Sequence, residues 1–330
     1  MVSPEKRTDL LVRLGKYMMS ESEEWVETQI RATNANPWFT AEHITIAVTN
    51  IVNELLDKDK IQEWLKEYNL PTTPRRVGIV MAGNIPLVGF HDFLCGFMAG
   101  HDLYLKLSSK DEVLLKHLIN KIAEWEPEAA KSIHIAEQLK NCEAYIATGS
   151  NNTARYLEQY FGKYPHIIRR NRTSVAILEG DETEEELAAL GKDVFTYYGL
   201  GCRNVTQVCV PEGYDFGRML EVFKGYEGCI HHNKYKNNYD YYLAIYLLNR
   251  VPYMTNESIL MVENELPFSA VSVLHYRYYT DLQQLVHQLQ EGKDIQTIVG
   301  RGFTPFGTAQ QPSLGEYADG VDTMAFLCSL

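Results

Sequence analysis

The sequence predicts an α/β fold with parallel sheets, preceded by a helical opening. Between residues 75 and 210, short apolar runs alternate with segments of helical periodicity, and this alternation of strands and helices is typical of a parallel sheet. The first 67 residues instead carry apolar positions at helical spacing only. At 330 residues the chain is longer than one ordinary hydrophobic core requires, so we expect two domains.

The individual elements follow from the spacing of apolar residues. After the helical opening the pattern predicts strands over 75–83, 101–107, 142–149, 174–178 and 205–210. Helices are predicted over 85–100, 110–125, 150–161 and 183–198, and Pro86 opens the first of these. Helical patterns dominate 211–264, and strands at 270–276 and 294–300 then flank a helix at 282–289. The last thirty residues are rich in Gly, Pro and polar side chains.

The charge of the chain limits its partners. With 43 acidic and 31 basic residues the net charge is -12, which argues against broad nucleic-acid binding and against docking on an anionic membrane. The N-terminal segment carries charges where a signal peptide would be apolar, and no stretch approaches the roughly 18 apolar residues of a membrane span. We therefore expect a cytoplasmic protein without membrane insertion.

Cys202 is the candidate nucleophile. It lies in the peptide YYGLGCRNVTQV, where a predicted helix meets a strand, and Gly199 and Gly201 before it let the backbone turn tightly. A thiolate attacks an acyl thioester readily, and the resulting acyl-cysteine keeps its carbonyl activated. The alternative is that Cys202 is a small buried hydrophobic residue, as most thiols are. The six cysteines lack the spacing of a zinc site, so we expect reduced thiols and no bound metal.

Two further peptides carry polar residues where predicted strands end. Asn84, in AGNIPL, can donate its amide to a developing oxyanion, or it merely caps the following helix. Lys106, in YLKLSS, ends the next strand and is followed by Ser108 and Ser109. Such a lysine can hold a ribose or a phosphate, or it is a solvated surface charge.

A third peptide, IATGSNNTARY, joins a strand to a helix through Gly149 and Ser150. The N-terminus of that helix would favour an anionic pyrophosphate, although the chain has no GxGxxG fingerprint. Arg169, Arg170 and Arg172 follow, and they either hold phosphates or form a solvated basic edge.

Taken in order, these peptides resemble the aldehyde dehydrogenase superfamily and, within it, the LuxC-type acyl-CoA reductase branch, from about residue 75 to the end. The resemblance implies that Asn84 is the oxyanion donor, that Lys106 binds the adenosine ribose and that Cys202 is the nucleophile. It places Ser108, Ser109, Gly149 and Ser150 near the cofactor. It also implies an aldehyde-dehydrogenase-like fold, with a helical opening and nicotinamide-binding domain over 1–172 and a catalytic domain and C-terminal tail over 173–330.

The resemblance continues after the nucleophile. The peptide ELPFSAVSV is similar to the family's Glu-x-Phe-Gly-Pro-Val segment, which implies that Glu265 binds the nicotinamide ribose, with Pro267 and Ser269 departing from the pattern. PFGTAQQPSLGEYADG resembles the closing Pro-Phe-Gly segment of the family.

Two departures from the family pattern bear on function. Aldehyde-oxidising members carry a general-base glutamate ahead of the cysteine, where this chain has HIIRRNRTS at 166–174. Because that glutamate activates the water that hydrolyses the acyl-enzyme, its absence disfavours oxidation. Ser109 stands where NAD-preferring members often carry a ribose-binding glutamate, and Lys110 follows it. The loss of that repulsion favours NADPH, with NADH as the alternative.

The resemblance implies NADPH-dependent reduction of an acyl thioester, carried by CoA or an acyl carrier, to an aldehyde through an acyl-cysteine on Cys202. A CoA-acylating aldehyde dehydrogenase working in the reverse direction would use the same residues. The pattern is also compatible with a cysteine acyltransferase without hydride transfer and with a non-catalytic scaffold. Superfamily members commonly self-associate, so a homo-oligomer is compatible with the resemblance.

Overall fold

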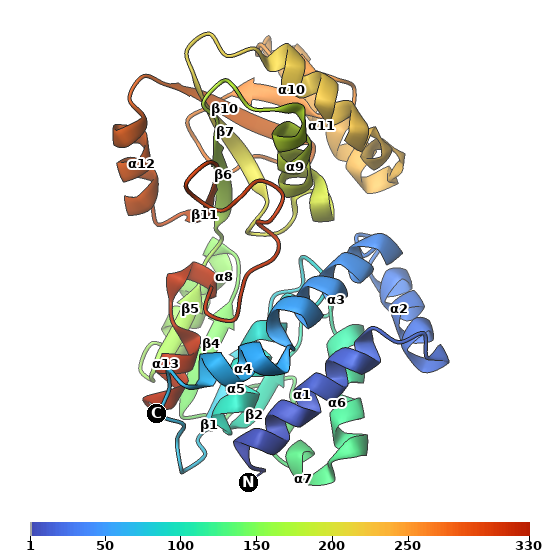
Figure 1. Ribbon diagram of the computed structural model, residues 1–330, viewed down its shortest axis with the longest axis vertical. Coiled ribbons are helices and arrows are strands. Elements are labelled where there is room, and N and C mark those ends of the chain that lie inside the picture. The colour runs from blue at the N-terminus through green and yellow to red at the C-terminus, as the bar shows by residue number, and fades with distance from the viewer. Residues whose placement is uncertain (1) are drawn as a thin grey trace. The chain divides into compact units, whose positions relative to one another are not determined.

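The computed structural model describes residues 2–330, which form two compact units (Figure 1). The first unit comprises the chain up to residue 171 together with residues 311–330, and the second comprises residues 172–310. Residues 311–330 thus pack with the first part of the chain, whereas the sequence predicts a division after residue 172 that groups them with the second part. Within residues 2–330, no helix has both the length and the apolar character needed to cross a membrane.

The first unit opens with four helices, which confirms the predicted helical opening. They are α1 (Pro4–Met18), α2 (Glu23–Ala35), α3 (Ala41–Leu55) and α4 (Lys58–Leu65). Helices α1, α3 and α4 are N-capped by Ser3, Thr40 and Asp57, respectively. Each of these side chains accepts a hydrogen bond from a backbone N–H of the first turn. Buried apolar residues of these helices, such as Leu11 and Trp25, join the main core of the unit.

A five-stranded parallel sheet with the order β3-β2-β1-β4-β5 forms the centre of the first unit. Its strands are β1 (Arg76–Val80), β2 (Asp102–Lys106), β3 (Ile133–Ile135), β4 (Ala144–Thr148) and β5 (His166–Arg169). The connecting helices are α5 (Phe90–Ala99), α6 (Val113–Trp125), α7 (Pro127–Ala130) and α8 (Asn151–Phe161). The parallel pairing confirms the predicted sheet type, while β3 and β5 are strands that the apolar pattern does not predict.

The predicted helix over 85–100 is wrong at its start. Helix α5 begins at Phe90, and residues 84–89 form turns in which Leu87 has a left-handed φ of 57°. The buried carboxylate of Asp111 accepts the backbone N–H groups of Leu87 and Val88. A tertiary contact therefore satisfies these amides in place of a helix, and Pro86 does not open one.

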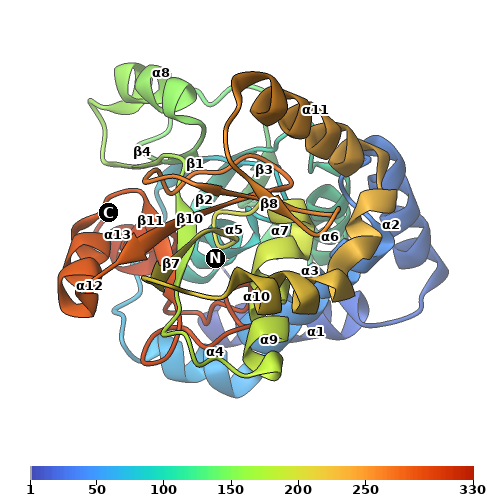
Figure 2. The same ribbon diagram turned by 90° about the horizontal axis from the view of Figure 1, so that it is seen from above.

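The second unit contains a six-stranded sheet with the order β11-β6-β7-β10-β9-β8. Its strands are β6 (Thr173–Ile177), β7 (Val205–Pro211), β8 (Met254–Thr255), β9 (Leu260–Glu263), β10 (Val273–Tyr279) and β11 (Ile295–Val299). The helices are α9 (Glu184–Phe195), α10 (Phe216–Phe223), α11 (Asn233–Asn249) and α12 (Leu282–Glu291), with 3-10 segments η1 (Thr196–Gly199) and η2 (Lys224–His231). The pair β8–β9 is antiparallel and the remaining pairs are parallel, and α12 lies on the opposite side of the sheet from α9 and α10 (Figure 2).

Residues 311–330 complete the core of the first unit. They contain the 3-10 segment η3 (Ala318–Gly320) and the helix α13 (Thr323–Cys328), which packs against α5. Met324 and Leu327 are fully buried in the main core, and the Trp64 Nε1–H donates to the Tyr317 hydroxyl at 2.9 Å. A segment with the Gly- and Pro-rich composition of a tail is therefore an integral part of this unit.

Candidate functional site

Three sequence-predicted positions of the first unit share one edge of its sheet. Asn84 follows β1, Lys106 ends β2, and Gly149 follows β4. Strands β2, β1 and β4 are neighbours and run parallel, so their carboxyl ends lie side by side. Ligands collect at this edge of a parallel sheet. Asn84 and Lys106 are both exposed there.

The segment after Lys106 packs closely on the segment before Asn84. A Cβ atom on Gly83 would lie 2.5 Å from the Ser108 Oγ, so Gly83 leaves room for Ser108. The Ser108 hydroxyl also accepts the backbone N–H of Lys110 at 3.3 Å, which fixes the turn. Ser109 and Lys110 are exposed at its tip.

Helix α8 begins at the same edge. Ser150 is its N-cap, and the Ser150 hydroxyl accepts the backbone N–H of Thr153 at 3.3 Å. The helix N-terminus therefore lies directly after β4, where its dipole favours an anion. Together with the cation of Lys106, this edge fits an anionic dinucleotide, and the residues that would hold it are the predicted Lys106, Ser108, Ser109, Gly149 and Ser150.

The three arginines of the peptide HIIRRNR have separate partners. Arg169 is buried and donates to the Asp92 carboxylate at 2.5 Å and to the Thr323 hydroxyl at 2.7 Å. It joins β5, α5 and α13, so it is a structural residue and not a phosphate ligand. Arg170 pairs with Glu158 at 2.6 Å, and Arg172 Nη1 donates to the carbonyl of Ile295 at 3.0 Å.

Asp111 is a residue of this region that the sequence reasoning misses. Its buried side chain accepts two backbone amides of the turn that follows Asn84, and burial raises the pKa of this carboxyl group well above its usual value. Within residues 2–330, its Oδ1 atom has no hydrogen-bond partner. An aspartate five residues after a strand carries no signal of this contact, because its partners are amides more than twenty residues earlier.

Cys202 lies in the turn between α9 and β7, as predicted. Three consecutive residues before it are left-handed, with φ values of 54° at Tyr197, 56° at Tyr198 and 75° at Gly199. Only glycine adopts this conformation at no cost, so the packing of the two tyrosines must maintain it. Both tyrosines are buried, and the Tyr198 ring stacks on His232 with centroids 4.6 Å apart.

The buried side chain of Asn204 forms hydrogen bonds with backbone groups on both sides of this turn. Its Nδ2 donates to the carbonyls of Asp193 at 2.9 Å and Thr196 at 2.8 Å, and its Oδ1 accepts the backbone N–H of Gly201 at 2.7 Å. The residue is fully buried. Asparagine is common in turns, but the sequence does not reveal these partners because they depend on the left-handed residues between them.

The segment of Glu265 is anchored on the strand that follows Cys202. Gln207 Nε2 donates to the carbonyl of Asn264 at 2.8 Å, and the Thr206 hydroxyl donates to that of Pro267 at 2.5 Å. The Glu265 side chain itself is 80% exposed and faces Arg277 at 3.5 Å. Strand β7 thus begins just after Cys202. Two of its buried side chains hold the segment that contains Glu265, the residue predicted to bind the nicotinamide ribose.

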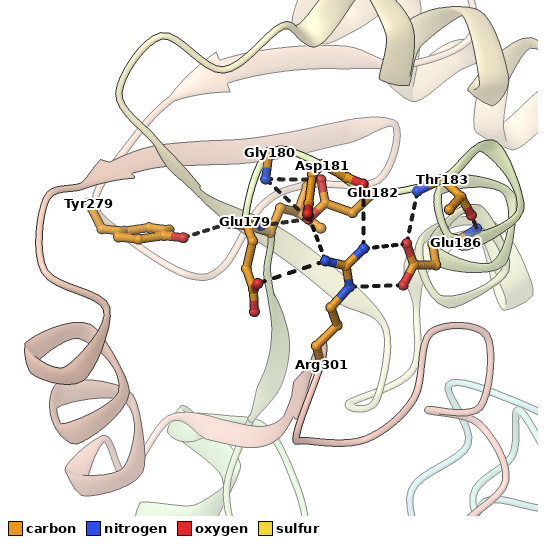
Figure 3. Close-up of polar contacts among 9 residues, drawn as sticks. Glu179, Gly180, Asp181, Glu182, Thr183, Glu186, Tyr279 and Arg301 are labelled. Carbon is orange, nitrogen blue, oxygen red and sulfur yellow. Dashed lines mark hydrogen bonds and ion pairs between the residues drawn. The ribbon is translucent and has the colours of Figure 1, made fainter.

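The carboxylates around the start of α9 are held by Arg301. Its guanidinium contacts Asp181 at 2.6 Å, Glu186 at 2.8 Å and Glu179 at 3.8 Å (Figure 3). Glu182, by contrast, is buried and accepts the backbone N–H of Glu179 at 2.5 Å. Glu179 therefore pairs with an arginine, in keeping with its sequence position away from the family's general base.

Asp193 connects the end of α9 to the segment after β11. Its carboxylate accepts the backbone N–H groups of Gly307 at 2.6 Å and Ala309 at 3.0 Å. Burial raises the pKa of Asp193 to about 6, although the two amides act in the opposite direction. The same residue thus holds the Pro-Phe-Gly segment through its side chain and the Cys202 turn through its carbonyl.

Of the other two thiols of the second unit, one differs from Cys202 in exposure and one resembles it. Cys209 is fully buried in β7, and burial raises its pKa. Cys229 and Cys202 are both half-buried, and no disulfide joins any of the six cysteines, all of which lie in the described part of the chain. Among residues 2–330 no group of three His, Cys, Asp or Glu side chains lies close enough to hold a metal ion.

Comparison with known proteins identifies the fold. No family model and no curated protein matches the chain. Among solved structures, aldehyde dehydrogenase 21 from Physcomitrella patens in complex with succinate is similar with a TM-score of 0.65 at 12% identity, covering 91% of this chain and 74% of that one. An aldehyde dehydrogenase from Mycobacterium tuberculosis complexed with NAD+ gives 0.63 at 13% identity, covering 87% and 70%.

A third similar structure is the glyceraldehyde-3-phosphate dehydrogenase from Methanocaldococcus jannaschii complexed with NADP. It gives a TM-score of 0.60 at 13% identity, covering 90% of this chain and 76% of that one. The chain therefore has an aldehyde-dehydrogenase-like α/β fold, as the sequence predicts.

Proposed function

We propose that this protein reduces an acyl thioester, carried by CoA or an acyl carrier, to an aldehyde with NADPH, in the manner of LuxC-type acyl-CoA reductases. The observation that supports this most is the position of Cys202: a half-buried thiol in a restrained turn between α9 and β7 of an aldehyde-dehydrogenase-like fold. A thiol in a fixed backbone loses little entropy when it attacks, and this favours a nucleophilic role.

In the proposed reaction the Cys202 thiolate adds to the thioester carbonyl, while the Asn84 amide donates to the developing oxyanion. The new carbon–sulfur bond forms, the bond to the carrier sulfur breaks, and the carrier thiolate takes up a proton. A reduced nicotinamide cofactor, which Lys106, Ser108 and Ser109 would help to hold, would supply the hydride that the acyl carbon takes up. The resulting thiohemiacetal on Cys202 then loses its carbon–sulfur bond, which releases the aldehyde and regenerates the thiolate.

Release as an aldehyde rather than an acid is supported by the carboxylates at the start of α9, whereas Asp193, at the other end of this helix, is engaged by the backbone N–H groups of Gly307 and Ala309. Hydrolysis of an acyl-cysteine needs a general base beside the sulfur. Glu179, Asp181 and Glu186 are paired with Arg301 at the start of α9. Helix α9 rises about 13 Å between Glu186 and Phe195, so these groups lie a helix length away from the Cys202 turn.

A nicotinamide cofactor is supported by the sheet edge of the first unit, where Lys106 at the end of β2 and the N-terminus of α8 after β4 lie on either side of β1. Two of the similar structures are complexes with NAD+ and NADP, respectively. We propose NADPH as the preferred form, because Ser109 and Lys110 are exposed there and offer a hydroxyl and a cation to a 2′-phosphate.

The test is to mix the protein with NADPH and acyl-CoAs of increasing chain length and to follow the loss of reduced nicotinamide absorbance. We expect turnover that Cys202→Ala lowers by about 10³-fold or more, because the covalent route is removed. Cys229→Ala is the matched control, since that thiol is also half-buried in the second unit. It should keep turnover within about twofold of the wild type. Undiminished turnover in Cys202→Ala would exclude the mechanism.

The competing functions give different outcomes in the same assay. Acyl transfer from CoA to another thiol, without consumption of NADPH, would identify an acyltransferase. Faster formation of acyl-CoA from aldehyde, CoA and NADP+ than of aldehyde from acyl-CoA would identify the reverse direction as the main one. Binding of neither acyl-CoA nor nicotinamide would identify a scaffold.

A further inference from the structure

The turn before Cys202 contains more backbone strain than any other stretch of the described chain. Tyr197, Tyr198 and Gly199 are consecutive left-handed residues, whereas the other positive-φ positions are isolated or paired. For the two tyrosines this conformation costs about 1–2 kcal/mol each. Such strain persists only when surrounding contacts impose it, so the contacts that hold this turn are of functional interest.

We propose that Asn204 is a positioning residue that fixes the backbone orientation of Cys202; this inference rests on the proposed role of Cys202 as nucleophile. The Asn204 amide bonds to both sides of the strained stretch. It donates to the carbonyls of Asp193 and Thr196 before that stretch, and it accepts the N–H of Gly201 after it. Gly201 is covalently joined to Cys202, so the clamp ends one peptide bond from the nucleophile.

A second set of contacts fixes the other side of Cys202. The Ser174 hydroxyl donates to the Cys202 carbonyl at 3.1 Å, and the Ser174 backbone N–H donates to the Asn204 carbonyl, also at 3.1 Å. The Asn204 N–H donates to the Gly201 carbonyl at 3.1 Å. The peptide units on both sides of Cys202 are therefore tied to Asn204 or to β6.

The chemistry of this position requires an amide. A primary amide is the side-chain group that offers two donors and an acceptor without charge. Alanine would leave the Gly201 N–H and the Asp193 and Thr196 carbonyls without this partner inside a buried turn, and the turn would relax away from its strained geometry. A displacement of the nucleophile by about 1 Å can cost about 10²-fold in rate.

The matched control is Asn256, which holds another turn of the same unit. Its Oδ1 accepts the backbone N–H groups of Ser258 at 3.1 Å and Ile259 at 3.2 Å, and its Nδ2 donates to the Leu220 carbonyl at 3.1 Å. Its neighbour Glu257 is also left-handed, with φ of 72°. Asn256→Ala therefore removes a similar clamp that has no connection to Cys202.

The experiment compares Asn204→Ala with Asn256→Ala in the full-length protein by two readouts. The first is kcat and KM with acyl-CoA and NADPH. The second is the pH profile of alkylation of Cys202 by iodoacetamide, followed by mass spectrometry of the peptide that contains it. We expect Asn204→Ala to lower kcat about 10- to 100-fold with an NADPH KM within about twofold of the wild type, and to shift the alkylation profile. Asn256→Ala should leave both readouts at wild-type values.

The proposal is overturned if Asn204→Ala keeps the wild-type kcat and alkylation profile while losing thermal stability as Asn256→Ala does. If the wild type does not reduce acyl-CoA, the proposed function fails, and the alkylation profile alone decides the role of Asn204. If Asn204→Ala does not fold, Ser174→Ala replaces it, because it removes only the contact to the Cys202 carbonyl. A smaller loss in the same direction then supports the proposal, and wild-type values overturn it.

Discussion

The turn after Asn84 and the turn before Cys202 both contain left-handed backbone but are held by different groups. The first contains one non-glycine residue in the left-handed region and the second contains two, and each turn is fixed by one buried side chain that binds backbone groups. In the first unit that side chain is the carboxylate of Asp111, which comes from a distant segment. In the second unit it is the amide of Asn204, which belongs to the turn itself.

The difference shows what each group contributes as a clamp. A carboxylate can only accept hydrogen bonds, and its burial penalises the charged form, which is why the pKa of Asp111 is raised. An amide donates and accepts, and it has no charge to desolvate. The amide that holds the turn of the proposed nucleophile therefore does not depend on pH, whereas the carboxyl group that holds the turn of the proposed oxyanion donor does.

The largest effect on stability is expected from replacing the amide of Asn204 by a carboxylate, in comparison with the opposite replacement at Asp111. Asn204→Asp places a carboxylate against the carbonyls of Asp193 and Thr196 and loses both donors, so we expect the free energy of unfolding to fall by about 3–5 kcal/mol at neutral pH. Asp111→Asn can keep an accepting oxygen toward the amides and removes a buried charge. We expect a change of less than about 1 kcal/mol there.

Urea denaturation of both variants at several pH values provides the measurement. The loss in Asn204→Asp should shrink at acid pH, where the new carboxyl group is neutral and can donate one hydrogen bond. Equal losses in the two exchanges would contradict the distinction between the clamps. Asn256→Asp, at a half-buried turn, controls for the introduction of a carboxylate in itself.

The next effect concerns Asp193, a carboxylate on the Cys202 side of the comparison. Because its pKa is raised to about 6 in the folded protein, the folded state binds the proton more tightly than the unfolded state does. Its contribution to the free energy of unfolding should therefore fall as pH rises from about 4 to about 6, by at most about 3 kcal/mol. The measurement is the difference in unfolding free energy between wild type and Asp193→Asn across this window. A difference that rises with pH would refute the assignment.

The smallest effect is expected at Arg301. Its ion pairs with Asp181 and Glu186 are at the surface, where screening by water leaves little net stabilisation. Arg301→Gln should lower the thermal midpoint less than Asn204→Asp does, and the loss should decrease further in high salt. A salt-independent loss as large as that of Asn204→Asp would show that the carboxylate cluster, and not the amide, is the main support of this region.

The apolar pattern of the sequence predicts most of the fold because the sequences of buried parallel strands are short apolar runs. The strands at 75–83, 101–107 and 142–149 appear as β1, β2 and β4 with shorter ends. The edge strand β3 has only three residues, and β5 ends in a buried arginine, so neither has a full apolar signature. The predicted start of α5 is wrong because Asp111, a residue distant in sequence, accepts hydrogen bonds from the amides of the turn before this helix.

For the candidate site, the sequence indicates residues whose side-chain type itself suggests a chemical role. Asn84, Lys106 and Cys202 lie at the strand ends and the turn where the motifs place them, and their roles stay predictions. The supporting residues Asn204, Asp111 and Asp193 escape such reasoning. Their function depends on which backbone groups the fold brings within reach, and two consecutive left-handed tyrosines are not foreseen from residue type.

The discontinuous first unit has a consequence for the order of events during protein synthesis. Residues 311–330, which supply Tyr317, Met324 and Leu327 to its core, follow the whole of the second unit in the chain. A ribosome therefore completes the second unit first, and the five-stranded sheet must wait for its last helix with part of its apolar surface uncovered. Exposed apolar surface of this kind promotes aggregation of nascent chains, so the first unit is where we expect dependence on chaperones.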